Sequence, residues 1–113
     1  MAKSIAYSAI VSFGMLAATG LTATADDTGF ASIHDLRREG GRLCMSDHDH
    51  SGSGNGRTQA LAQRSAIGSW ASFTALEYGS SWASFGNAIE KGMNCSGGGG
   101  WSCSLAATPC RPF

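Results

Sequence analysis

Four cysteines constrain the fold of this chain more than any other feature of its sequence. They are spaced as Cys44-x50-Cys95-x7-Cys103-x6-Cys110. The spacing contains no C-x2-C pair of the kind that zinc knuckles use, and an even number of cysteines in a small exported chain is typical of disulfides. Four cysteines allow three pairings. If residues 97–100 form the tip of a hairpin, Cys95 lies opposite Cys103, which favours the pairs Cys95–Cys103 and Cys44–Cys110.

The first 25 residues have the pattern of a signal peptide for export. Lys3 supplies a positive charge, residues 5–16 are apolar and uncharged, and Ala23-Thr24-Ala25 offers small side chains directly before Asp26. The apolar stretch is shorter than the roughly 20 residues that a membrane-spanning helix needs, which argues against a retained anchor. We therefore expect a periplasmic or secreted protein, with no transmembrane span after residues 1–25 are removed.

The length and charge of the chain limit its size class and its partners. A chain of 113 residues permits one domain at most. It has 8 Lys+Arg and 8 Asp+Glu, so removal of Lys3 leaves 8 − 1 = 7 basic against 8 acidic groups and a net charge near −1. This charge opposes binding to a polyanion, so no nucleic-acid partner is expected.

The segment from Thr58 to Tyr78 has the pattern of one helix of about 20 residues. It contains no proline, its large apolar residues recur at helical spacing, Thr58 can serve as the N-cap, and Gly79 can follow the end in a left-handed conformation. Before it, residues 26–41 carry little periodicity and are expected to be a poorly ordered leader. The glycine- and serine-rich residues 51–56 are expected to form an irregular loop.

A β-hairpin is predicted after this helix. Residues 88–95 alternate apolar and other side chains, residues 97–100 form the turn, residues 101–108 supply the partner strand, and Pro109 ends the pairing. Residues 80–88 fit either helical or strand spacing. Residues 42–46 can add a third strand. The predicted fold class is α+β: one helix packed on a small antiparallel hairpin or three-stranded sheet, tied by disulfides, in a domain spanning 42–113.

The helix and hairpin region carries a spaced set of residues: Trp70, Phe73, Tyr78, Gly79, Trp82, Ala88, Cys95, Trp101, Cys103, Ala107, Pro109, Cys110 and Arg111. With this pattern the region resembles small exported bacterial proteins of uncharacterised function, which have a C-terminal helix–hairpin module ending in A-x-P-C. The resemblance covers roughly residues 58–111. It implies an exported α+β domain with a disulfide-tied end, and it brings no known activity or catalytic residue.

The run Asp47-His48-Asp49-His50 is the strongest candidate for chemistry. Two histidines at i and i+2 of an extended segment project to one face, and the two aspartates add oxygen donors. Imidazole and carboxylate groups suit Zn, Cu or Ni, and His34 is within reach if the leader folds back. The alternative is a solvated polar turn, in which these side chains hydrogen-bond the local backbone.

Sequence motifs of catalysis are missing around the candidate nucleophiles. No G-x-S-x-G elbow surrounds Ser46, Ser51 or Ser53, and residues 51–56 lack the Gly-Lys-Ser/Thr ending of a P-loop. We therefore expect a non-enzymatic exported domain without an organic cofactor, acting by contact with a macromolecule in the envelope or outside the cell. The alternative function is low-affinity binding of a transition metal through the Asp47–His50 run.

Overall fold

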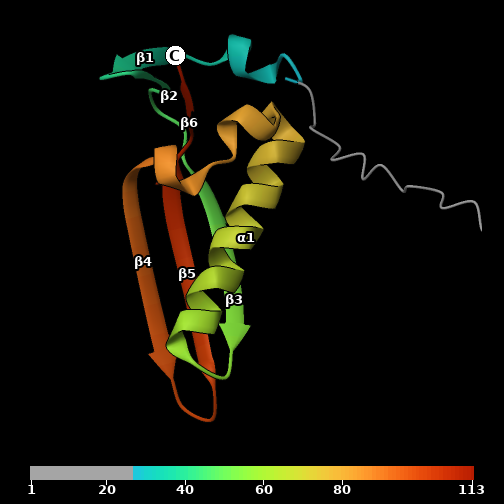
Figure 1. Ribbon diagram of the computed structural model, residues 1–113, viewed down its shortest axis with the longest axis vertical. Coiled ribbons are helices and arrows are strands. Elements are labelled where there is room, and N and C mark those ends of the chain that lie inside the picture. Colours follow the sequence, from blue (N-terminus) through green and yellow to red (C-terminus); the bar gives the residue numbers. More distant parts are fainter. Residues whose placement is uncertain (1–26) are drawn as a thin grey trace, which may run out of the picture.

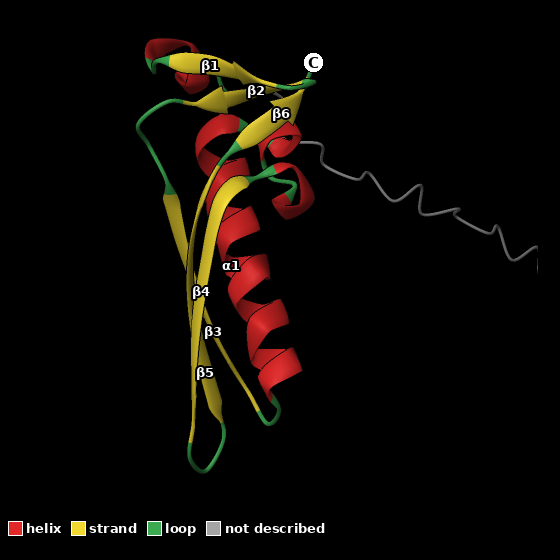
Figure 2. Cartoon of the chain, turned by 90° about the vertical axis from the view of Figure 1, so that its left-hand side faces the viewer, coloured by secondary structure: helices red, strands yellow, loops and turns green. Residues whose placement is uncertain are grey.

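The computed structural model describes residues 27–113, so the predicted signal peptide lies outside the described residues. Two antiparallel three-stranded sheets and one long helix make up this part of the chain (Figure 1). The larger sheet has the order β3 (His50–Gly56), β5 (Trp101–Thr108), β4 (Ile89–Gly97). The smaller has the order β1 (Leu36–Glu39), β2 (Arg42–Met45), β6 (Cys110–Pro112). Helix α1 (Gln59–Tyr78) lies along one face of the larger sheet, and the smaller sheet lies beyond its C-terminal end (Figure 2). This arrangement confirms the predicted disulfide-tied α+β class.

Helix α1 forms where the sequence predicts it. The Thr58 hydroxyl accepts a hydrogen bond from the Leu61 N–H at 3.2 Å, which satisfies one of the free donors of the first turn. The helix ends at Gly79, whose φ of 109° is positive as expected, although its ψ of 163° is not that of the left-handed helix. Every fourth residue of the helix is buried: Ala62, Ala66, Trp70, Thr74 and Tyr78. The first three pack with residues of β5 in the larger sheet, and Tyr78 belongs to a second cluster at the C-terminal end of the helix.

Strand β3 corrects the expectation of an irregular loop at residues 51–56. Its glycines alternate with polar residues, and Gly52, Gly54 and Gly56 face α1 while the residues between them are exposed. A Cβ atom at Gly52 or Gly54 would overlap the backbone of Ala66, and one at Gly56 would lie 2.7 Å from the Ala62 nitrogen. These glycines therefore let a helix approach a strand closely, instead of making the segment flexible.

The hairpin and the disulfides follow the pattern expected from the sequence. Cys95 lies opposite Cys103 in the β4–β5 register, and the two are bonded. Cys44 of β2 lies opposite Cys110 of β6, and these two are also bonded. Pro109 separates β5 from β6, so the chain leaves the larger sheet there and enters the smaller one. The ambiguous residues 80–88 form two short 3-10 turns, Ser80–Trp82 and Phe85–Asn87.

The segment before residue 42 differs from the expected poorly ordered leader. It contains a 3-10 turn, η1 (Phe30–Ile33), and strand β1, which pairs with β2. The turn is held because Ala31 is buried in a small apolar cluster with Met45, Tyr78 and Trp82. As a further correction, residues 42–45 join this smaller sheet, and β3 is the third strand of the hairpin sheet.

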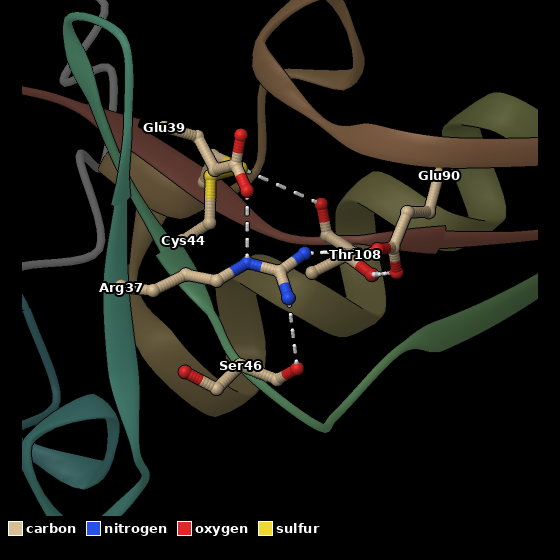
Figure 3. Close-up of polar contacts among 7 residues, drawn as sticks. Arg37, Glu39, Cys44, Ser46, Glu90 and Thr108 are labelled. Carbon is tan, nitrogen blue, oxygen red and sulfur yellow. Dashed lines mark hydrogen bonds and ion pairs between the residues drawn. A yellow bond between two sulfur atoms is a disulfide. The ribbon is translucent and has the colours of Figure 1, made fainter.

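Arg37 links the two sheets (Figure 3). Its guanidinium donates to Glu90 Oε1 at 2.8 Å and to the Ser46 carbonyl at 3.3 Å. Glu90 lies at a bulge in β4, and its other carboxylate oxygen accepts a hydrogen bond from the Thr108 hydroxyl. The hydrogen bond from Arg37 holds the pKa of Glu90 below its usual value. The contact fixes β1 and the loop after β2 beside the larger sheet, and this loop carries the candidate site.

Candidate metal centre

The candidate site lies where β3 begins and α1 ends. Because β3 leads into α1 through a short turn and the two elements run in opposite directions, the first residue of β3 lies beside the last turns of the helix (Figure 1). His50 is that first residue, and Thr74 and Glu77 belong to those last turns. His48 lies in the loop just before β3. The fold therefore brings the histidine run to a helix face that carries a carboxylate.

His50 is held rigidly, and its hydrogen bonds define its tautomer. Its side chain is only 1% exposed, and Nδ1 lies 2.9 Å from the Thr74 hydroxyl oxygen. The Thr74 hydroxyl donates its single proton to the carbonyl of Trp70 at 2.8 Å, so its oxygen can only accept from His50. We therefore assign the proton of the neutral ring to Nδ1, which leaves the lone pair on Nε2.

The lone pair of His50 Nε2 faces a second electron-rich atom. Nε2 lies 3.2 Å from Glu77 Oε2, yet this buried nitrogen has no hydrogen-bond partner, because the contact lacks hydrogen-bond geometry. Two ligand atoms that are each about 2.0–2.1 Å from a tetrahedral zinc ion lie about 3.3 Å apart. The spacing of His50 Nε2 and Glu77 Oε2 therefore fits a pair of atoms that bind the same cation.

His48 supplies a third ligand atom. Its Nε2 lies 4.0 Å from Glu77 Oε1, and its ring meets the His50 ring edge-on with the centroids 5.1 Å apart. One ligand atom from each of His48, His50 and Glu77 lies within 4.8 Å of the others. Two imidazoles and one carboxylate make the donor set of several zinc sites, and they also suit copper and nickel.

The aspartates of the run lie apart from this trio. Asp47 and Asp49 are exposed and alternate with the histidines. They line a surface cavity of about 260 Å³ with Ser46, His48, Glu90 and Thr108. The trio thus contains His48 and His50, as the sequence suggested, but its carboxylate comes from Glu77. The sequence gives one indication of this contact. Thr74 is a polar residue among the buried positions of α1, and a buried hydroxyl needs a polar partner, which here is His50.

Burial keeps His50 in the neutral form that binds metals. Desolvation is the largest effect and lowers the pKa of His50, and the nearby His48 and His34 lower it further. Glu77 and Asp49 act in the opposite direction without reversing the shift. A neutral imidazole can coordinate a metal ion, whereas an imidazolium cannot. His50 is therefore a competent ligand at neutral pH.

Tyr78 lies at the centre of the aromatic contacts around the site. Its ring stacks on His50 with the centroids 4.9 Å apart, and it meets His34 edge-on at 5.4 Å. Its hydroxyl oxygen lies 3.2 Å from His34 Nε2. Burial raises the pKa of Tyr78, and the neighbouring Glu77 carboxylate raises it further, so the phenol stays protonated. Tyr78 also meets the His48 ring edge-on at 6.2 Å, so it contacts all three histidines.

Comparisons with models of protein families, with curated proteins and with solved structures found no match. The resemblance of residues 58–111 to exported bacterial proteins therefore stays a prediction. Among the described residues, no helix has the length and apolar character needed to cross a bilayer.

Proposed function

We propose that this protein is a small disulfide-tied domain that binds one divalent transition-metal ion between His48, His50 and Glu77. The single observation that carries the proposal is the buried Nε2 of His50, which has no hydrogen-bond partner and lies 3.2 Å from Glu77 Oε2. Without a cation or a proton between them, the lone pair and the carboxylate repel each other in a poorly solvated place. A metal ion relieves this repulsion and uses both atoms.

Zinc is the ion that suits the three ligands best in an exported protein, and copper and nickel are the alternatives to compare with it. Zinc accepts mixed nitrogen and oxygen ligands in tetrahedral geometry and has no redox chemistry of its own. Support for export comes from the signal-peptide pattern of residues 1–25 and from the two disulfides, which are typical of oxidising compartments. We therefore place the metal-binding domain in the periplasm or outside the cell. Contact with an envelope or extracellular macromolecule, and the absence of enzymatic activity, stay predictions.

Calorimetric titration of the disulfide-bonded protein with Zn²⁺, Cu²⁺ and Ni²⁺ tests this function. We expect one ion per chain. We expect Glu77→Gln to weaken metal affinity by about tenfold or more, since changing even the residues that hold a metal ligand in place costs about that much affinity. The matched control is the double change Asp47→Asn and Asp49→Asn, which removes two carboxylates from the same neighbourhood but leaves the trio intact. No heat above the buffer blank, or loss of binding only in the control, would contradict the proposal.

A further inference from the structure

A third histidine lies beside the proposed site but comes from a different part of the chain. His34 follows η1 and precedes β1, and its ring stacks on His48 with the centroids 4.9 Å apart and the planes 27° apart. Its side chain is half-buried, and Nε2 contacts the Tyr78 hydroxyl. The nearest ligand atoms of His48, His50 and Glu77 form a group that does not include His34. His34 therefore borders the trio without belonging to it.

The segment that carries His34 is attached to the same two helix residues that shape the site. The Thr28 hydroxyl donates to the carbonyl of Glu77, and the Thr28 N–H donates to the carbonyl of Tyr78 at 3.3 Å. Asp27 adds an ion pair with Arg111 at 2.9 Å. The segment 27–34 thus bridges the C-terminal end of α1, and a small movement of this segment changes the distance from His34 to the trio.

The contact with Tyr78 decides which nitrogen of His34 remains for a metal ion. The Tyr78 hydroxyl oxygen lies 3.2 Å from Nε2 of His34, and this contact occupies that nitrogen. A metal ion would therefore bind at Nδ1, and the ring proton would then lie on Nε2 and be donated to the Tyr78 oxygen. Tyr78 would hold the N–H of His34 as Thr74 holds the N–H of His50, which is the usual arrangement for a ligating histidine.

We propose that His34 is the fourth protein ligand of the ion bound by His48, His50 and Glu77, and that the bound ion adds a second attachment of segment 27–34 to the end of α1, beside the hydrogen bonds of Thr28. This inference rests on the proposed function. Three histidines and one carboxylate fill the four positions of a tetrahedral zinc ion and leave none open to water, as in structural sites. The bound ion would then connect the N-terminal segment, the loop before β3, the start of β3 and the helix.

Two measurements on the disulfide-bonded protein test the fourth ligand. The first records the ring-nitrogen resonances of the histidines during titration with ZnCl₂. We expect His34, His48 and His50 to shift together and to reach their end points at one zinc per chain. The second records amide hydrogen exchange of residues 28–34, which should slow when zinc is bound because the ion attaches the segment to the helix at a second point.

Variants separate ligation from packing. His34→Gln should weaken zinc binding by about tenfold or more and abolish the slowing of exchange at residues 28–34. The matched control is Ser32→Ala, which removes a hydrogen bond of 2.6 Å to the Gly29 carbonyl in the same segment and should leave zinc affinity unchanged. If the wild type binds zinc with shifts at His48 and His50 alone, His34 is not a ligand, although the proposed function stands. If the wild type binds no zinc, the proposed function itself is wrong.

Discussion

His50 and Glu77 meet where β3 begins and α1 ends, and Nε2 of His50 lies 3.2 Å from Oε2 of Glu77 without a hydrogen bond. The Nδ1–H of His50 is held by Thr74, so the ring cannot turn its proton toward the carboxylate without losing that contact. A proton on Nε2 would also satisfy the pair, but burial lowers the pKa of His50 and disfavours the imidazolium. The pair therefore has neither a hydrogen bond nor a proton between its two atoms, and the proposed metal ion would bind both.

Glu77→Gln should stabilise the metal-free protein while weakening zinc binding. The amide of glutamine can donate a hydrogen bond to the lone pair of His50 Nε2, so we predict a rise of about 1 kcal/mol in the free energy of unfolding without metal. Denaturant unfolding in the presence of a chelator measures it. If Glu77 instead pairs with an imidazolium, the same substitution destabilises the protein. Glu39→Gln, which removes a surface ion pair with Arg37, is the control and should change stability little.

The stability of the metal-free protein should fall on acidification through the histidine range. The pKa of His50 is lower in the folded protein than in the unfolded chain, so below about pH 6.5 the unfolded chain binds more protons. The contribution of His50 is therefore fully present above that pH and is lost as the pH falls toward the folded pKa. The charged groups that act on the pKa of His50 are Glu77, His48, Asp49 and His34.

Denaturant unfolding at about pH 7.5, 6.5 and 5.5 measures this dependence, because these values lie above, at and below the ordinary pKa of histidine. His50→Gln should flatten the curve, since glutamine keeps a polar side chain and does not titrate. An equally steep loss of stability in this variant would assign the effect to other groups.

The glycines of β3 should tolerate no side chain on the helix-facing side. Gly54→Ala places a methyl group against the backbone of Ala66, and such overpacking costs about 1–3 kcal/mol of stability. Gly68→Ala is the matched control, since Gly68 lies inside α1 with nothing within 4 Å of an added Cβ. That change should raise stability by about 0.5–1 kcal/mol. Thermal unfolding of the two variants should move the midpoints in opposite directions.

The two disulfides should differ in their contribution to stability. Cys44–Cys110 closes a sequence separation of 66 residues, and Cys95–Cys103 one of 8. Chain entropy gives about 4.4 kcal/mol for the long link and about 2.6 kcal/mol for the short one. Replacing Cys44 and Cys110 by alanine should therefore lower the unfolding midpoint more than replacing the other pair. Peptide mapping without reduction checks the pairing, and a peptide linking Cys44 to Cys95 would contradict it.

The elements that the sequence predicts correctly are those with local signals. The Thr58 cap and Gly79 mark the ends of α1, and the glycines at 97–100 mark the hairpin turn. Strand β3 was missed because its glycines indicate flexibility when only the local sequence is considered. Their actual role, close contact with Ala62 and Ala66, depends on the helix that packs over them.

The candidate site could be predicted only in part for the same reason. His48 and His50 are two residues apart in sequence and their spacing is informative, whereas Glu77 reaches them only because β3 and α1 pack antiparallel. Asp47 and Asp49, the nearer carboxylates in sequence, alternate with the histidines and are exposed. His34 lies beside the site only because residues 27–34 are ordered. The burial of Ala31 orders this segment, and the local sequence does not indicate that burial.

Anomalous X-ray scattering from a crystal of the zinc-loaded protein tests the central claim most directly. The account predicts one strong peak at about 2.0–2.1 Å from Nε2 of His48 and of His50 and at about 2.0–2.2 Å from a carboxylate oxygen of Glu77. A peak held by Asp47 or Asp49 instead, or no peak near His50 at saturating zinc, would contradict it.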